Sequence, residues 1–294
     1  MAETNRCRAV FITGAGGGIG RSCVSLLAAN GYTVFAGVHR PMAPDTWEFS
    51  PDNGRIIPIT LDIRFDEDVQ QAIDAISRRL STVDLIGVVN CAGVCFPGPL
   101  ELIEPSEVLN MLNINVVGQL RVIQACLPLL STSRGRIVVI GSTSGAIPGV
   151  FTGAYSASKF ALAAITGVLR AELAASGIAV SIIDPGVIGT PFWEKTADRV
   201  TALLAHPRTG LLSDGTRAPL IGWRRGIVKL ADNAADPEQV ARCLLHALTA
   251  KRPQSRYTVG IKAKLKLMVW KFLPETLKDI VIRRPLNSRS PPEN

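Results

Sequence analysis

Residues 8–29, RAVFITGAGGGIGRSCVSLLAA, decide the fold, because a short apolar run there is followed by a glycine cluster and then by an amphipathic segment. The apolar run predicts a buried strand, and the spacing of the apolar residues after the glycines predicts a helix. Glycines let a backbone turn sharply and come close to a phosphate, and the start of a helix offers free N–H groups. We therefore expect a strand, a phosphate-binding loop and a helix, in that order.

The rest of the chain repeats this alternation of β-rich apolar runs and helical patterns. Near-continuous Val/Ile strands joined by helices are typical of a parallel sheet that is covered on both faces, with ligands bound beyond the carboxyl ends of its strands. The sequence thus predicts a single doubly wound (Rossmann-type) α/β sheet with a C-terminal helical extension. The expected strands are 32–38, 55–63, 83–93, 135–142 and 178–186, and the expected helices are 66–80, 106–130, 154–177 and 237–250.

Two regions depart from the strand–helix pattern and define the expected domain organisation. Residues 190–230 have no clear strand period and follow a strand's carboxyl end, where substrate covers tend to lie, so we expect a mobile helical lid there. Residues 1–260 are expected to form the catalytic, dinucleotide-binding domain. Residues 261–294 are expected to form a basic amphipathic extension with a disordered end.

Composition narrows the class of protein further. The six cysteines are scattered without CxxC pairs, and the three histidines are far apart, so we expect reduced thiols and no metal site. The start of the chain shows no export signal, and no uninterrupted apolar run approaches the ~18 residues that a spanning helix needs. These features favour a cytoplasmic enzyme over an integral membrane protein.

The net charge of +8 is concentrated at the end of the chain, since residues 251–294 carry eleven Lys/Arg and three acids. Residues 261–284 mix these bases with Leu, Met, Val, Trp and Phe, a pattern suited to amphipathic helices interrupted at Pro274. Peripheral membrane contact, capping of a substrate pocket and contact with a second subunit all remain open for this segment. No nucleic-acid-binding module accompanies the charge, so we expect no nucleic-acid partner.

Several motifs together resemble the short-chain dehydrogenase/reductase family. The glycines at 14, 18 and 20, the segment Asn90-Cys91-Ala92-Gly93, and Tyr155-Ser156-Ala157-Ser158-Lys159 match its patterns in order over roughly residues 8–190. The extended C-terminal portion resembles the hydroxysteroid and retinol dehydrogenase branches. By this resemblance the catalytic residues are Asn115, Ser142, Tyr155 and Lys159. It also implies a homodimer or homotetramer formed through the helices at 106–130 and 154–177.

The chemistry of the tyrosine–lysine pair can be argued from spacing alone. Tyr155 and Lys159 stand at i and i+4, on one face of a helix. A phenol titrates near ~10, and a neighbouring ammonium favours its ionised form, so we expect Lys159 to lower the pKa of Tyr155. Tyr155 would exchange a proton with the substrate oxygen while a nicotinamide exchanges hydride with carbon, and Ser142 would hydrogen-bond that oxygen. The resemblance implies that Asn115 supports a water leading toward Lys159, and that Lys159 holds the nicotinamide ribose.

The predicted cofactor site combines the glycine loop with strand ends. At the end of the second strand an acid favours NAD and a base favours the 2′-phosphate of NADP; because His39 and Arg40 stand there, we favour NADP(H) over NAD(H). The remaining positions rest mainly on the resemblance. The full predicted set is Gly14, Gly18, Ile19, Gly20, His39, Arg40, Asp62, Ile63, Asn90, Ala92, Gly93, Tyr155, Lys159, Pro185, Gly186 and Thr190.

The residues expected around the substrate are largely apolar, apart from Ser142 and Tyr155. They predict a lipophilic secondary alcohol or ketone, or a retinoid-like alcohol or aldehyde. A non-catalytic, dinucleotide-sensing regulator of the same fold is the alternative, which the intact four-residue constellation disfavours. The apolar candidates are Val94, Phe96, Pro97, Ala146, Ile147, Pro148, Val150, Phe151, Phe192 and Trp193.

Overall fold

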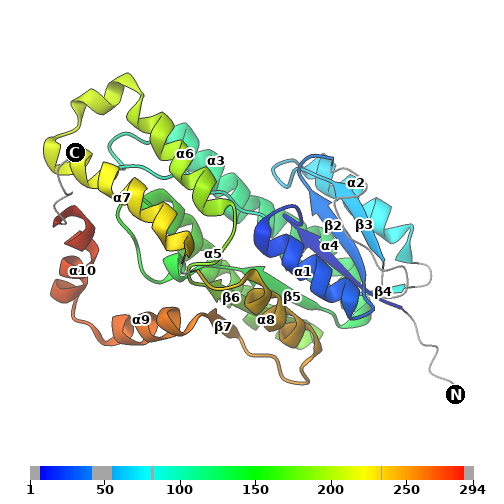
Figure 1. Ribbon diagram of the computed structural model, residues 1–294. Helices are drawn as coiled ribbons and strands as arrows, with labels where there is room; N and C mark the ends of the chain where they lie inside the picture. Colours follow the sequence, from blue (N-terminus) through cyan, green and yellow to red (C-terminus); the bar gives the residue numbers. More distant parts are fainter. Residues whose placement is uncertain (1–6, 42–54, 81–82, 233, 288–294) are drawn as a thin grey trace, which may run out of the picture.

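A seven-stranded parallel sheet forms the centre of the computed structural model, which describes residues 7–41, 55–80, 83–232 and 234–287 (Figure 1). The strand order is β3–β2–β1–β4–β5–β6–β7, and the order reverses between β1 and β4. The predicted doubly wound α/β fold is therefore confirmed. The strands are β1 Cys7–Thr13, β2 Thr33–Val38, β3 Ile56–Thr60, β4 Val83–Asn90, β5 Arg136–Ile140, β6 Ala179–Pro185 and β7 Arg256–Val259.

Helices cover both faces of this sheet and bury a separate apolar core on each (Figure 1). One core joins the sheet to α1 (Gly18–Ala29) and α8 (Pro237–Thr249). The other joins it to α2 (Asp66–Ser77), α4 (Gln119–Ser133) and α5 (Gly153–Glu172). Because each strand points alternate side chains to opposite faces, Val10 and Ile12 enter the first core while Ala9 and Phe11 enter the second.

The helix predicted at 106–130 is longer than expected and changes its hydrogen-bonding pattern midway. It runs through α3 (Pro105–Leu112), a π-helical segment η3 (Asn113–Gly118) and α4. Within the described residues, Pro105–Ser133 is the one helix long and apolar enough, by length and composition, to cross a membrane. Its α4 part packs against β4 and α2, which is the position of a core helix of this layer.

One long helix ends earlier than expected, and one strand was not predicted. The helix predicted at 154–177 ends at Glu172 and is followed by the short 3-10 helix η5 (Ala174–Ser176), with Gly177 in the left-handed conformation at φ 73°. Strand β7 was not predicted, because four residues, RYTV, are too short a stretch to show a period. The cap of α8 was predicted correctly, since the Asp236 carboxylate accepts from the Glu238 N–H at 2.8 Å.

The segment expected as a lid is helical, and its role as a lid stays a prediction. It consists of α6 (Phe192–Leu204), the 3-10 helix η6 (Pro207–Leu211) and α7 (Asp214–Asp232). Beyond β7 come α9 (Ile261–Phe272) and α10 (Glu275–Asn287), which break at Pro274 as predicted. The end expected to be disordered, residues 288–294, lies outside the described residues.

Candidate active site

In the loop between β1 and α1, the three glycines predicted to bind phosphate stand where any side chain would clash. Gly14 has φ +66°, and a Cβ there would come within 2.7 Å of the Ala92 backbone. A Cβ on Gly18 would lie 2.5 Å from the Thr190 side chain, and one on Gly20 would strike the Gly14 carbonyl. No side chain caps the start of α1, so its first N–H groups are free for an anion. The loop thus fits a dinucleotide pyrophosphate.

Hydrogen bonds join the carboxyl ends of β1 and β4, the two neighbouring strands between which the strand order reverses. The Thr13 hydroxyl accepts from the Cys91 and Ala92 N–H groups at 3.2 and 3.3 Å, and Thr13 pairs in register with Asn90. Asn90 is fully buried and donates to the Gln119 carbonyl at 2.8 Å, so its amide fastens β4 to α4. The predicted role of Asn90 at the cofactor stays a prediction.

The structure brings Ser142, Tyr155 and Lys159 together as the sequence predicts. Ser142 follows β5, while Tyr155 and Lys159 lie in the first turns of α5, and the Ser142 side chain is near enough to the Tyr155 phenol to lower its pKa. The Lys159 ammonium lies 5.8 Å from the centre of the Tyr155 ring and donates to the Ile140 carbonyl at 3.0 Å. A phenol, a hydroxyl and an ammonium therefore converge at the carboxyl end of β5.

The direction of the pKa shifts differs from the sequence-based expectation. Burial, followed by the nearby Cys95 and Asp184, raises the pKa of Tyr155, and the nearby Ser142 side chain lowers it only in part. Burial also lowers the pKa of Lys159 to about 8. The expected lowering of the Tyr155 pKa by Lys159 does not occur, because the exclusion of water disfavours the charged forms of both side chains. The Tyr155 phenol is therefore protonated at neutral pH.

Asn115 lies in the π-helical segment η3 and organises the floor of this site. Its side-chain oxygen accepts from the Val94 N–H, and its amide donates to the Val94 carbonyl, both at 2.8 Å. The same amide donates to the Ser158 hydroxyl at 2.9 Å, and Ser158 in turn donates to the Tyr155 carbonyl at 2.7 Å. Asn115 therefore ties the loop after β4 to the helix that carries Tyr155, which is a positioning role the sequence did not reveal. Its predicted support of a water stays a prediction.

Asp184, which the sequence analysis did not single out, holds the backbone of Ser142 in place. It is 3% exposed at the end of β6, accepts from the Ser142 N–H at 3.1 Å and pairs with Arg256 of β7 at 3.2 Å. Burial raises the pKa of its carboxyl, and Arg256 opposes that rise. A charged residue in the otherwise apolar run 178–186 was the signal that could have found it.

The predicted adenosine end of the site lies beyond β2 and β3. His39 and Arg40 are exposed, and His39 Nε2 lies 3.1 Å from an Asp62 carboxylate oxygen. Arg64, which the sequence analysis missed, donates to both carboxylate oxygens of Asp62 and holds the pKa of that carboxyl below its usual value. Ile63 is buried in the second core. His39 and Arg64 thus meet the Asp62 carboxylate where a ribose 2′ substituent is expected, and Arg40 follows His39 directly in the chain.

The segment after β6 has a mixed outcome for the predicted residues. Thr190 faces Gly18 of the loop, and its predicted contact with the nicotinamide stays a prediction. Pro185 ends β6, and Gly186 donates to the Val259 carbonyl at 3.1 Å with its Cα facing α9. Gly93 lies beside Asn115 and Lys159. The structure therefore gathers these positions at the carboxyl edge of the sheet, and their contacts with a cofactor stay predictions.

Apolar side chains surround the phenol on the sides that lack polar groups. The Tyr155 and Phe192 rings are 6.1 Å apart, and Phe192 is followed by Trp193 at 5.2 Å in an edge-to-face arrangement. Val94 and Phe96 pack in the same cluster as Tyr155. Val150 and Phe151 pack with lid residues of α6 and α7 in another cluster, and Ile147 is buried. This environment supports the predicted apolar surroundings of the reacting group.

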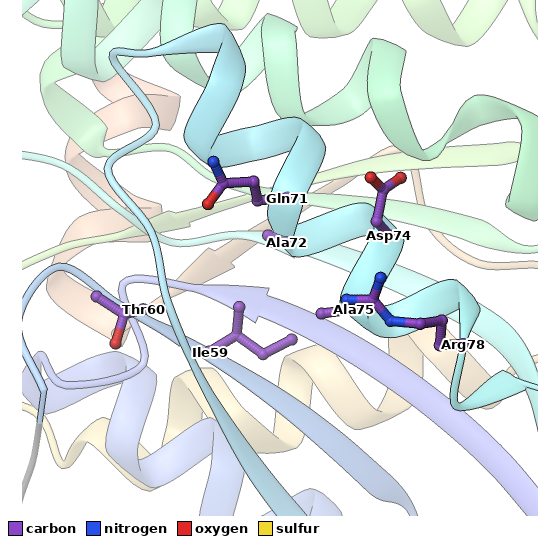
Figure 2. Close-up of a pocket in the computed structure, with 7 residues that line it drawn as sticks. All are labelled: Ile59, Thr60, Gln71, Ala72, Asp74, Ala75 and Arg78. Atoms are coloured by element: carbon purple, nitrogen blue, oxygen red, sulfur yellow. The ribbon is translucent and has the colours of Figure 1, made fainter.

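A groove of about 340 Å³ between β3 and α2 is separate from this site (Figure 2). It is lined by Ile59, Thr60, Gln71, Ala72, Asp74, Ala75 and Arg78, none of which is a predicted site residue.

Within the described part of the chain, no three His, Cys, Asp or Glu residues are arranged to hold a metal ion.

Comparison with known proteins identifies the class. Residues 8–201 match the family model described as short chain dehydrogenase. Human retinol dehydrogenase 5 is 35% identical over 281 residues, covering 93% of this chain and 87% of that protein. A 3-amino-tetrahydro-pyrrolizinone reductase of Xenorhabdus hominickii is 33% identical, covering 87% of this chain and 88% of that protein. The chain belongs to the short-chain dehydrogenase family and is an NAD(P)-dependent oxidoreductase.

Further relatives and solved structures agree with this assignment. Human 17-beta-hydroxysteroid dehydrogenase type 6 is 27% identical, covering 94% of this chain and 87% of that protein, which places the chain near the retinol and hydroxysteroid branches. A short-chain dehydrogenase from Streptomyces avermitilis has a TM-score of 0.74 at 24% identity, covering 96% of this chain and 97% of that one. One from Burkholderia cenocepacia, in complex with NADP, has a TM-score of 0.67 at 21% identity, covering 96% and 98%. At these identities the structures support the fold.

Proposed function

We propose that the protein transfers hydride between NADP(H) and a lipophilic secondary alcohol or ketone, or a retinoid-like alcohol or aldehyde. The observation that carries the proposal is the Tyr155 phenol, which lies beside Ser142 and is flanked by Phe192 in apolar surroundings. Relatives named as retinol and 17-beta-hydroxysteroid dehydrogenases support this substrate class. When bound, the nicotinamide would supply or accept the hydride.

Four residues of the site have separate roles in the proposed mechanism. Tyr155, protonated at neutral pH, donates its proton to the carbonyl oxygen in reduction and takes it back in alcohol oxidation. Ser142 hydrogen-bonds the same oxygen where negative charge develops. The buried Lys159 ammonium offers its remaining N–H groups to a ribose hydroxyl, while Asn115 keeps Val94 and α5 in place.

The substrate class is tested by a screen of steroid, retinoid and aliphatic ketones with NADPH, following the loss of nicotinamide absorbance. The proposal expects turnover of the lipophilic compounds that falls strongly in Tyr155→Phe. Activity confined to small polar sugars contradicts the substrate class. Tight dinucleotide binding without turnover of any compound would favour the alternative, a regulator that senses the dinucleotide.

The preference for NADP(H) rests on the charge at the end of β2. Arg40 is exposed there, and the Asp62 carboxylate that could accept from a free 2′-hydroxyl is already held by Arg64 and His39. Arg40→Ala should raise KM for NADPH about tenfold and leave KM for NADH nearly unchanged. Arg79→Ala, at an exposed arginine just after α2, is the matched control. A wild-type preference for NADH contradicts the proposal.

Self-association is proposed through the long helices of the second face. Exposed apolar side chains lie on α3, η3 and α5: Leu109, Val117, Phe160 and Val168. Large apolar residues exposed on neighbouring helices are typical of subunit interfaces. Light scattering should show a dimer or tetramer for the wild type and a smaller species for Phe160→Glu. A monomeric wild type contradicts this assembly.

A further inference from the structure

The C-terminal helix α9 presents an apolar stripe that no other part of the described chain covers. Its exposed apolar residues are spaced i, i+4, i+7, i+8 and i+11, so they share one face of the helix. The opposite face, with Ala263 and Trp270, is half-buried, and Ala263 approaches Gly186 after β6. The helix is thus anchored to the body on one side. The residues of this stripe, called the α9 stripe below, are Ile261, Leu265, Met268, Val269 and Phe272.

Helix α10 extends the apolar surface and encloses a groove with α9. Leu277, Ile280 and Val281 of α10 are also exposed. A groove of about 310 Å³ lies between the helices, lined by Lys262, Leu265, Lys266, Val269, Trp270, Leu273 and Val281. Both helices lie along the outside of the molecule beyond β7 (orange and red in Figure 1).

The charges beside the α9 stripe have one sign. Lys262, Lys264, Lys266 and Lys271 are all exposed, and α9 contains no acidic residue. At 100° per residue, Lys264 and Lys271 border one side of the stripe and Lys262 the other. Burying this face against a second copy would bring two sets of lysines together, which opposes self-association. An anionic surface with an apolar interior satisfies both the stripe and the lysines.

We propose that α9 and α10 dock on the surface of an anionic phospholipid bilayer, with the α9 stripe inserted at the headgroup boundary and its lysines on lipid phosphates. The docked face adjoins the proposed lid, since α10 packs on α7 and Leu286 joins the apolar cluster of Val200, Leu220 and Phe151. A docked molecule would therefore keep the proposed lid, α6 and α7, next to the bilayer in which lipophilic substrates dissolve. This last point rests on the proposed substrate class, whereas bilayer binding does not.

The experiment measures co-sedimentation of the full chain with vesicles of phosphatidylcholine alone or with added phosphatidylserine, in the absence of any substrate. The proposal expects binding to the anionic vesicles that weakens with salt. Lys264→Glu/Lys271→Glu and Leu265→Gln/Phe272→Gln should each lower the partition coefficient about tenfold or more. Because all four residues are exposed, both variants should fold, and unchanged thermal unfolding verifies this.

Matched controls lie elsewhere on the surface. Lys251→Glu/Arg252→Glu reverses two exposed charges outside α9, and Leu100→Gln removes an exposed leucine from the segment between β4 and α3. Both controls should bind anionic vesicles as the wild type does. Absence of wild-type binding, or equal losses in the controls and the α9 variants, overturns the proposal. A stripe variant that changes the oligomeric state without affecting vesicle binding also overturns it, because a second copy would then cover this face. Turnover of a water-soluble ketone tests the enzymatic proposal separately.

Discussion

Replacing Lys159 with methionine should stabilise the protein while removing its activity. Lys159 is 5% exposed, and burial lowers its pKa from 10.5 to about 8. That change corresponds to a cost of ~3 kcal/mol for the charged form in the folded protein. Methionine has a similar length and no charge, but it forfeits the hydrogen bond to the Ile140 carbonyl, worth about 1 kcal/mol. Lys159→Met should therefore gain roughly 2 kcal/mol of unfolding free energy at pH 7.

The pH dependence gives this prediction its sign. Between pH 8 and 10.5 the unfolded chain keeps the lysine proton that the folded protein has lost, so wild-type stability rises with pH in that window relative to Lys159→Met. Below about pH 8 both states are protonated and the advantage of the variant is constant. Urea unfolding of both proteins at pH 7 and pH 9.5 measures the difference directly. A variant that is less stable at pH 7, or whose advantage does not shrink at pH 9.5, refutes the reasoning.

Three further changes probe other parts of the site. Gly18→Ala should raise the Kd for the dinucleotide at least about tenfold, because its Cβ would displace the Thr190 side chain at 2.5 Å. Titration of cofactor fluorescence measures this Kd, and an unchanged affinity contradicts the loop assignment. Asp184→Ala should lower kcat about tenfold, because it leaves the Ser142 N–H without its acceptor, and Asp184→Asn should recover most of that loss. Equal losses of kcat in the two variants would show that the charge of Asp184 matters instead. For ketone reduction, kcat/KM of the wild type should fall as pH rises through about 8, where Lys159 loses its proton; a flat profile to pH 10 would show that its charge is not needed.

Local sequence patterns predicted most of the fold and the proximity of Tyr155 and Lys159. The glycines at 14, 18 and 20 between a strand and a helix placed the phosphate loop, and the i, i+4 spacing of Tyr155 and Lys159 placed both side chains on one helical face. These features depend on residues that are neighbours along the chain, so a sequence displays them directly.

What the sequence did not reveal depends on neighbours in space. Asp184 supports Ser142 because β6 lies beside β5, and Arg256 reaches Asp184 from β7, a strand too short to be recognised. The pKa of Tyr155 rises because the fold excludes water from the phenol, whereas the spacing indicated only that a lysine is near. Arg64 likewise acts through the direction of its side chain toward Asp62, which no pattern encodes.

The central claim is that the Tyr155 phenol is the proton donor and acceptor of the reaction. Tyr155→Phe removes one hydroxyl and keeps the ring that packs against Phe192. The measurement is single-turnover hydride transfer to a lipophilic ketone by wild type and variant, at saturating dinucleotide. The account predicts a loss on the order of 10³ in rate with dinucleotide affinity retained. A variant that transfers hydride within about tenfold of the wild-type rate would contradict it.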